Sequence, residues 1–412
     1  MLMQRTLDSM DDRLQDHGEK VAYIMYQLLK SHGGYSQEEI IKLTMLALFH
    51  DIGVYKIEER ERILDIESEA PREHAVYGYL FIKHFSPLSD SAKVVLGHHL
   101  YPKDMSDSGK IKIPKEAFLL NLADRIALLQ LQTKTVDPVW ILSKDKAYIL
   151  EEHKMLFEKA CKEQGLLQKI QDDAYLEELY EVLDQVVLTR KEIIEYIRML
   201  TCTIDFRSEA TLLHTITVEE ISFQIAKLMG LEERVAIKIK IAAMLHDIGK
   251  LFIPISILEK DGRLTREEFE VIKNHAIIGY RILSGMGIDD LRDIATLHHE
   301  KLNGKGYPFG LKGDQISKEA RIVAIADVLS ALVGKRSYKE PFSKEKVIAI
   351  LVDMGAREEI DVDICQMVVE HYDFIIERVT ANTKDTIHIY KHIMDEYKET
   401  LKNISTQGVS LK

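Results

Sequence analysis

Histidine and aspartate side chains that could bind metal recur in the same order in both halves of the 412-residue chain. The first set is His17, His50, Asp51, His74, His98, His99 and Asp124, and the second is His214, His246, Asp247, His275, His298, His299 and Asp327. The neighbouring sequences match too, "LALFHDIG" (46–53) with "AAMLHDIG" (242–249) and "LLNLAD" (119–124) with "IVAIAD" (322–327). Repetition at this long interval indicates two copies of one domain.

Each set contains five imidazoles and two carboxylates, which exceeds the four ligands of a tetrahedral zinc ion. The same donors suit two divalent ions, because the two oxygens of an aspartate can bridge metals about 4 Å apart. Nitrogen and oxygen ligands without thiolate favour Fe or Mn, with Zn as an alternative. Such a centre makes a nucleophile from water at neutral pH and neutralises the charge that develops on a phosphoryl group.

The competing interpretation is that these are ordinary core histidines. A buried histidine on an apolar face is more often a hydrogen-bonded core residue than a ligand, and a single His-Asp pair carries little information. Polar residues that are costly to bury, recurring at seven ordered positions of both halves, favour metal binding instead.

Helices are expected to position these side chains. Leu, Ile, Lys, Glu and Ala dominate the composition while glycine (21) and proline (8) are scarce, so the sequence predicts an all-α fold. Ser36 with Glu39, and Thr265 with Glu268, have capping-box spacing ahead of apolar runs, which predicts a helix start at each place.

The second His-Asp pair follows a mostly apolar segment, "VAIKIKIAAMLHDIGK" (235–250). This segment is expected to form a helix that delivers His246 and Asp247 at its C-terminal end, with Gly249 ending the helix.

The order of the motifs predicts two tandem helical domains, each with its own His-Asp (HD) motif. A divergent domain is expected over 1–140, a helical connector over 141–200, a second domain over 201–404 and a short tail over 405–412. The connector contains charged, periodic segments such as "ILEEHKMLFEKAC", interrupted at Gly165, and lacks the Ser/Gly/Pro composition of a flexible linker.

Charge and cysteine content exclude several classes of protein. The formal net charge of −12 argues against binding to nucleic acid polymers, which requires clustered positive potential. Cys161, Cys202 and Cys365 are isolated and odd in number, as expected in a reducing compartment. No apolar run has the length of a signal peptide core or of a membrane span, so we expect a cytoplasmic protein without membrane contact.

Residues 200–400 resemble the HD-GYP family, a branch of the HD phosphohydrolase superfamily. The resemblance is carried by "HDIGKLFIPISILEKDGRLTREEFEVIKNHAIIGYRIL" (246–283) and by "HHEKLNGKGYPFGLKGDQIS" (298–317). Such proteins are all-helical, hold a centre of two or three Fe- or Mn-type ions, and hydrolyse bacterial cyclic dinucleotides, chiefly cyclic di-GMP. The resemblance therefore implies a metal-dependent phosphodiesterase.

The resemblance also implies roles for individual residues. The whole second set would bind metal, with Asp247 as the bridge and Lys250 as the contact to the scissile phosphate. Arg336 and Lys339, in "GKRSYKEP" (334–341), would meet substrate phosphates, and Tyr307 would form a wall near the guanine or ribose.

Simpler interpretations of these accessory residues stay open. Lys250 could be a solvated lysine beyond a helix end, and Arg336 and Lys339 could be loop charges. Glu300 could orient a ligating histidine or be a surface charge.

The sequence departs from the family pattern at several positions. Ala210 replaces the glutamate that supplies a third metal site in some members, which favours two ions. Ser330 replaces a second aspartate, and Ser337 replaces a proline.

The first copy resembles the wider HD superfamily. It keeps all seven ligand types but has "HHLYPKDMSDSGKIKIP" in place of the Gly-Tyr-Pro loop, and Val54 where the second copy has Lys250. We expect a second metal site there that handles cyclic dinucleotides poorly. Regulation, dimerisation, ligand sensing and activity on another phosphoester are its open roles.

The sequence thus predicts hydrolysis of cyclic di-GMP to pGpG, and then to GMP, by attack of a metal-bridged hydroxide. The alternatives are hydrolysis of 3',3'-cGAMP or of a nucleotide phosphate, and a non-catalytic cyclic-dinucleotide receptor. A homodimer and a signalling-protein partner are both compatible with the sequence.

Overall fold

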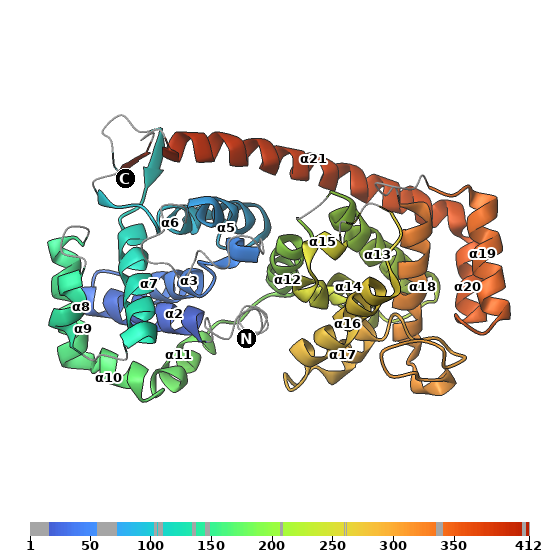
Figure 1. The fold of residues 1–412 in the computed structure, drawn as a ribbon, viewed down its shortest axis with the longest axis horizontal. Helices are drawn as coiled ribbons and strands as arrows, with labels where there is room; N and C mark the ends of the chain where they lie inside the picture. Colours follow the sequence, from blue (N-terminus) through green and yellow to red (C-terminus); the bar gives the residue numbers. More distant parts are fainter. Residues whose placement is uncertain are drawn as a thin grey trace. The chain divides into compact units, whose positions relative to one another are not determined.

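The computed structural model describes residues 16–55, 72–102, 105, 110–133, 137–144, 149–206, 209–258, 260, 262–334, 341–405 and 409–411. These residues are almost entirely helical, which confirms the predicted all-α class (Figure 1). The strands of the described ranges are β1 (Ile111–Ile113) and β2 (Val409–Leu411), which pair in parallel. Among the described helices, none combines the length and the apolar character that crossing a membrane requires.

The chain divides into two compact units, residues 3–199 with 393–412, and residues 200–392. The segment expected as a connector, 141–200, is helical and belongs to the first unit up to residue 199. The C-terminal end of the chain also belongs to the first unit, whereas the sequence places residues up to 404 with the second domain.

The first unit is built from helices that cover α2 at its centre. Helix α2 contacts α3, α7, α9 and α11, and its apolar residues from Val21 to Leu29 are buried. The helices and short 3-10 turns of this unit are α2 (His17–His32), α3 (Gln37–Leu48), η2 (Ile52–Tyr55), α5 (Arg72–Phe85), η4 (Ser89–Ser91), α6 (Ala92–Leu96), α7 (Glu116–Thr133), α8 (Pro138–Lys144), α9 (Glu151–Gln164), α10 (Leu166–Gln171) and α11 (Tyr175–Leu183).

The second unit repeats this plan around α13, which contacts α14 and α18. Its helices and turns are α13 (Glu209–Leu228), α14 (Glu233–Leu245), η6 (Ile248–Phe252), α15 (Ile255–Leu258), α16 (Arg266–Leu283), α17 (Asp289–Thr296), η7 (Gly313–Gln315), α18 (Lys318–Val333), α19 (Lys344–Ala356) and α20 (Val362–Glu370).

Two further helices contain the points at which the chain passes between the units. Helix α12 (Arg190–Asp205) leaves the first unit, and α21 (Tyr372–Ser405) begins in the second unit and ends in the first. In the first unit, Tyr397 of α21 stacks on Tyr77 of α5 with ring centroids 4.1 Å apart. Beside it, Glu396 accepts a hydrogen bond from His84 at 2.9 Å.

Both predicted capping boxes are present. Ser36 and Glu39 cap α3 reciprocally, and Thr265 and Glu268 cap α16 in the same way. Each box satisfies two backbone N–H groups that a helix start otherwise leaves without partners. Helix α16 matters for the site, because it carries His275.

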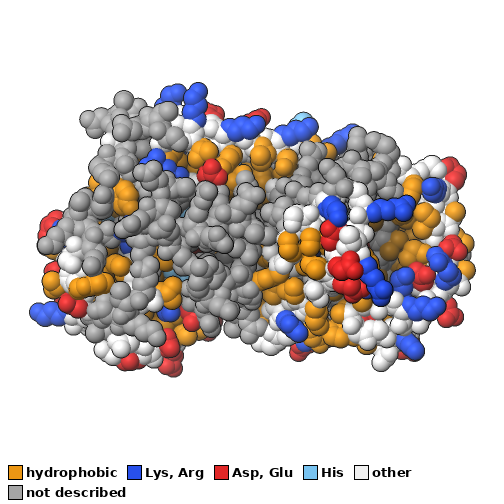
Figure 2. Space-filling view, in the orientation of Figure 1, with side chains coloured by type: hydrophobic (Ala, Val, Ile, Leu, Met, Phe, Trp, Pro, Cys, Tyr) orange, Lys and Arg blue, Asp and Glu red, His pale blue; other side chains and the backbone are white. Residues whose placement is uncertain are grey.

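Charged side chains of both signs are mixed on the surface. On the face shown in Figure 2, acidic and basic side chains of the described residues are interspersed, and no continuous basic stripe crosses them. Cys161 and Cys365 are free cysteines.

Candidate metal centre

The seven candidate ligands of the second unit lie on five helices or just after them. His214 belongs to α13, His275 to α16 and Asp327 to α18. His246 and Asp247 follow the last residue of α14, and His298 and His299 follow α17. The spacing of the motifs in the sequence therefore reflects one residue or pair contributed by each of five helices.

Asp247 lies at the centre of this group. Its Oδ2 is 3.0 Å from His246 Nε2 and 3.7 Å from His214 Nε2, while its Oδ1 is 3.4 Å from His275 Nε2. The two carboxylate oxygens thus face different imidazoles, which is the arrangement that a bridging ligand between two ions requires.

The remaining candidate ligands also lie within a few ångströms of one another. Asp327 Oδ1 is 3.2 Å from His214 Nε2, and its Oδ2 is 3.8 Å from His299 Nδ1. The Nε2 atoms of His275 and His298 are 3.4 Å apart. Ligand atoms of His214, His246 and Asp247 form one group within 4.8 Å, and those of His275, His298 and His299 form another. The structure therefore brings all seven predicted residues together.

Backbone contacts fix the orientation of three of the imidazoles. The Nδ1 atoms of His246, His275 and His298 lie 2.7, 2.6 and 2.8 Å from the carbonyl oxygen three residues earlier. A proton on Nδ1 leaves the lone pair of Nε2 directed at the centre, as metal ligation requires. His246 Nε2 is buried and lies 3.0 Å from Asp247 Oδ2, so this imidazole and carboxylate could bind the same cation.

Ser330 orients a fourth imidazole. Its Oγ lies 3.0 Å from His214 Nδ1, and the side chain is buried. The sequence shows this position only as a departure from the family pattern, and a histidine partner 116 residues away could not be inferred from it.

The electrostatics keep the carboxylates charged. Burial opposes ionisation of Asp247, but His246 and Lys250 outweigh it and hold the pKa of this carboxyl well below its usual range. Lys250 donates a hydrogen bond to Asp247 Oδ2. Burial, the largest influence, lowers the pKa of His299 to about 4, so its imidazole is neutral at physiological pH. Ionised carboxylates and neutral imidazoles are the forms that bind metal.

Asp205, the last residue of α12, is a buried acid near this centre that sequence reasoning missed. It is 2% exposed, and its Oδ1 has no hydrogen-bond partner. Burial raises its pKa to about 7, and the nearby charges of Asp247 and Lys250 act on it in opposite directions. Its place at the end of α12 offers no sequence signal, because one aspartate at a helix end is common.

The Gly-Tyr-Pro loop is anchored by Glu300. This buried carboxylate accepts hydrogen bonds from the backbone N–H groups of Phe309, Gly310 and Leu311 at 2.6, 3.0 and 3.0 Å. Glu300 is therefore not a surface charge, and its carboxylate holds the loop in place. The Tyr307–Pro308 peptide bond is cis.

The loop brings Tyr307 against the centre. Its ring centroid is 4.7 Å from that of His299, and its backbone N–H donates to the His299 carbonyl at 3.1 Å. Gly304 adopts φ +77°, which favours glycine. A Cβ on Gly306 would lie 2.4 Å from Lys301 N, so this residue must be glycine for the loop to approach the His-His turn. Lys273 adds a cation 5.6 Å from the Tyr307 ring.

One expectation about Gly249 is wrong. Helix α14 ends at Leu245, so Gly249 does not terminate it. Gly249 instead lies in η6, where a Cβ would be 2.0 Å from the carbonyl oxygen of His275. The residue is needed because the His-Asp turn packs directly on the backbone of α16.

Two predicted substrate contacts cannot be placed. Arg336 and Lys339 lie outside the described residues, so their roles stay predictions. Lys250 and Tyr307 both border the His/Asp centre, as the sequence predicted.

Comparisons with known proteins agree with this architecture. Models of the HD domain match residues 14–129 and 198–364. The 3'3'-cGAMP-specific phosphodiesterase 1 of Vibrio cholerae is 30% identical over 372 residues, which cover 84% of this chain and 85% of that protein. A cyclic di-GMP phosphodiesterase of Thermotoga maritima is 45% identical over 169 residues, or 40% of this chain and 45% of that protein.

A solved structure shares the fold. The crystal structure of a cyclic GMP-AMP specific phosphodiesterase of V. cholerae superposes with a TM-score of 0.57 at 18% identity, covering 90% of this chain and 96% of that one. The helical fold and the His/Asp centre define a protein of the HD-domain class. The chain belongs to the HD-GYP family of cyclic dinucleotide phosphodiesterases, with a divergent HD domain in its N-terminal half.

Proposed function

We propose that the second unit hydrolyses cyclic di-GMP to linear pGpG, and then to GMP. The observation that carries the proposal is a single group of seven His and Asp side chains that includes Asp247, whose two oxygens face different imidazoles. Lys250 and Tyr307 at the border of this group supply a cation and an aromatic wall for a nucleotide phosphodiester.

Two divalent ions would be held by these seven residues, one nearer His214 and His246 and one nearer His275, His298 and His299. Nitrogen and oxygen donors without thiolate favour Fe or Mn. Bound there, such ions supply a nucleophile from water at neutral pH and neutralise charge on the phosphoryl group.

Lys250 adds a protein charge beside the ions. Its ammonium group contacts Asp247 Oδ2 and its side chain is 22% exposed, so it can reach a phosphate oxygen from the position it already holds. Because the group is fixed by Asp247, little rearrangement is needed when negative charge develops on the substrate.

The loop of residues 304–311 would orient the nucleotide. Tyr307 stacks on His299, and Lys273 lies over the Tyr307 ring. Glu300 keeps this wall in place through three backbone hydrogen bonds. Arg336 and Lys339, on the segment that follows α18, are proposed to contact the substrate phosphates.

A second substrate, 3',3'-cGAMP, is favoured by one specific observation. The relative that matches across both units, over 85% of its own length, is named a 3'3'-cGAMP-specific phosphodiesterase. The two substrates differ in one base, so the same metal and phosphate contacts serve either.

The test is turnover of both dinucleotides by protein purified without oxygen and loaded with Mn(II) or Fe(II). Products are separated by chromatography and identified by mass. Linear pGpG from cyclic di-GMP supports the proposal, and a strong preference for 3',3'-cGAMP assigns the second substrate. Tight binding of both dinucleotides without any product contradicts the catalytic function and indicates a receptor.

A further inference from the structure

A cavity of the first unit lies at the C-terminal end of α2. Its volume is about 350 Å³, near the lower end of the range of about 300–1,000 Å³ that small-molecule sites occupy. Its wall is formed by the end of α2 and the residues just after it, by the start of α7, and by the first half of α9. The residues that line it all belong to the first unit.

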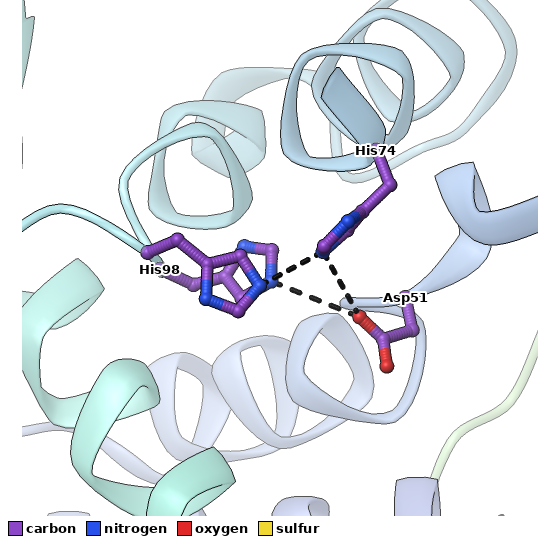
Figure 3. A group of neighbouring side chains, drawn as sticks. Asp51, His74 and His98 are labelled. Atoms are coloured by element: carbon purple, nitrogen blue, oxygen red, sulfur yellow. Dashed lines mark hydrogen bonds and ion pairs between the residues drawn. The ribbon is translucent and has the colours of Figure 1, made fainter. Parts of the chain in front are cut away.

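This cavity is separate from the His/Asp group of the same unit, which lies around the start of α2. There His17 Nε2 is 3.1 Å from Asp124 Oδ1, and His99 Nε2 is 2.8 Å from His74 Nε2. The Asp51 oxygens lie 3.4, 3.5 and 3.7 Å from the Nε2 atoms of His50, His74 and His98. Figure 3 shows Asp51, His74 and His98 pointing toward one another. Ser31, which lines the cavity, follows His17 on the same helix and lies about 21 Å further along its axis.

Two lysines give the cavity a positive side. Lys115 stands just before α7 and Lys159 lies on α9, and both are exposed, so a ligand can reach their ammonium groups from solvent. Lys159 Nζ donates a hydrogen bond to the Ser31 carbonyl at 2.8 Å, which holds it at the wall. Among the described residues, neither lysine forms an ion pair with a carboxylate. The acid in the lining, Glu152, has a side chain that is 65% exposed, so water screens its charge.

The buried side of the cavity carries polar groups. Ser31 is 5% exposed, and its Oγ has no hydrogen-bond partner. A buried hydroxyl without a partner is costly, and an acceptor oxygen placed against this wall would remove that cost. His153 is also buried, and burial lowers the pKa of its imidazole to about 4, while Glu152 opposes this lowering and Lys115 adds to it. The neutral imidazole can donate or accept a hydrogen bond beside the two cations.

The rest of the wall is aromatic and aliphatic. The ring centroids of His32 and Tyr35 are 4.9 Å apart, with an angle of 49° between the ring planes. The Tyr35 hydroxyl donates a hydrogen bond to Glu116 Oε1 at 3.0 Å, which fixes the position of the ring. Leu119 and Met155 add aliphatic surface. A ligand that complements this cavity therefore combines a negative charge with a planar ring.

We propose that this cavity binds a small anion built from a ring and a phosphate group, of the class of the nucleoside monophosphates. Lys115 and Lys159 contact the phosphate, and the rings of His32 and Tyr35 contact the base. A phosphate monoester carries a charge of about −1.5 to −2 at pH 7, which two ammonium groups balance. The volume of about 350 Å³ suits one nucleotide better than a cyclic dinucleotide, which contains two. The site does not depend on the hydrolysis proposed for the second unit.

Protection of lysines from acetylation tests the site in the full-length wild type. The protein is treated with acetic anhydride, with or without GMP, AMP or UMP, and each modified lysine is quantified by mass spectrometry. At least one mononucleotide is expected to reduce labelling of Lys115 and Lys159 severalfold. Labelling of Lys162 should not change, because this residue is exposed on α9 but does not line the cavity. Guanosine, which has no charge, and inorganic phosphate, which has no ring, should protect less.

Variants complete the test. Calorimetric titrations with the protecting mononucleotide are made on His246→Ala with Asp247→Ala, so that nucleotide binding at the candidate metal centre does not contribute. Adding Lys115→Met or Lys159→Met should weaken binding about tenfold, and adding Lys162→Met should leave it unchanged. Thermal melts without ligand establish that each variant is folded. Labelling of Lys115 and Lys159 that no mononucleotide changes, or equal affinity in all three lysine variants, overturns the proposal.

Discussion

Replacement of Gly249 by alanine probes how closely the His-Asp turn must pack on α16. A Cβ at this position would lie 2.0 Å from the carbonyl oxygen of His275 and 2.8 Å from the N–H nitrogen of Gly279. Both neighbours are backbone atoms, so neither can rotate away. Gly249 is not among the residues with positive φ, so alanine is acceptable to the local backbone and the effect is steric.

The size of the effect follows from this geometry. Real Cβ atoms essentially never approach other atoms within 3.0 Å, so the turn and α16 must separate by about 1 Å. That movement takes His246 and Asp247 away from His275. A misplacement of about 1 Å costs roughly a hundredfold in rate, and overpacking costs about 1–3 kcal/mol of stability.

The assay is kcat/KM for cyclic dinucleotide hydrolysis with metal content and Tm measured on the same samples. Gly355→Ala is the matched control, because its Cβ would make an ordinary contact of 3.6 Å with Val362. We expect Gly249→Ala to lose about a hundredfold and Gly355→Ala to lose little. Near wild-type turnover and metal content in Gly249→Ala would refute the packing argument.

Four further results are expected. Lys250→Met should lower kcat by roughly a hundred- to a thousandfold while the metal content stays unchanged. Loss of metal in this variant would instead show that Lys250 is needed for metal binding. Glu300→Gln weakens three hydrogen bonds to the loop and should raise KM about tenfold with little change in metal content. An unchanged KM would show that the loop does not contribute to substrate binding. Gly53→Ala, whose Cβ would lie 2.0 Å from the His74 carbonyl, should lower the Tm because overpacking costs about 1–3 kcal/mol, and an unchanged Tm would contradict the close packing there. Burial lowers the pKa of His153 to about 4, below its unfolded value, so the stability that the neutral ring contributes above pH 6.5 is lost as the pH falls toward 4. Thermal melts of wild type and His153→Leu at pH 7.5 and 5 should show a smaller acid destabilisation in the variant, and equal shifts would contradict this.

The sequence predicted the seven His and Asp side chains that come together in the second unit and the helices that carry them, because both depend on local patterns. Histidine and aspartate at fixed intervals mark the turns, and capping boxes such as Ser36 with Glu39 mark helix starts. A single pair such as His246-Asp247 says little about function. Because the same residue types recur in the same order in both halves of the chain, each of them could be recognised as a candidate ligand.

Contacts between distant segments could not be predicted. Ser330 orients His214 across 116 residues, and the end of α21 packs on Tyr77 from more than 300 residues away. Glycine is common at helix ends, so the sequence predicts that Gly249 ends a helix, whereas the backbone of His275 decides its place. The carboxylate of Glu300 has three backbone partners that only the folded loop reveals.

The most direct measurement of the central claim is metal-dependent turnover of cyclic dinucleotides by three proteins side by side. They are the wild type, the double variant His246→Ala with Asp247→Ala, and the double variant His50→Ala with Asp51→Ala. We predict a linear dinucleotide product from the metal-loaded wild type, no product from the variant of the second unit, and product from the variant of the first unit. Undiminished turnover in His246→Ala with Asp247→Ala would contradict the assignment of the chemistry to residues 200–392.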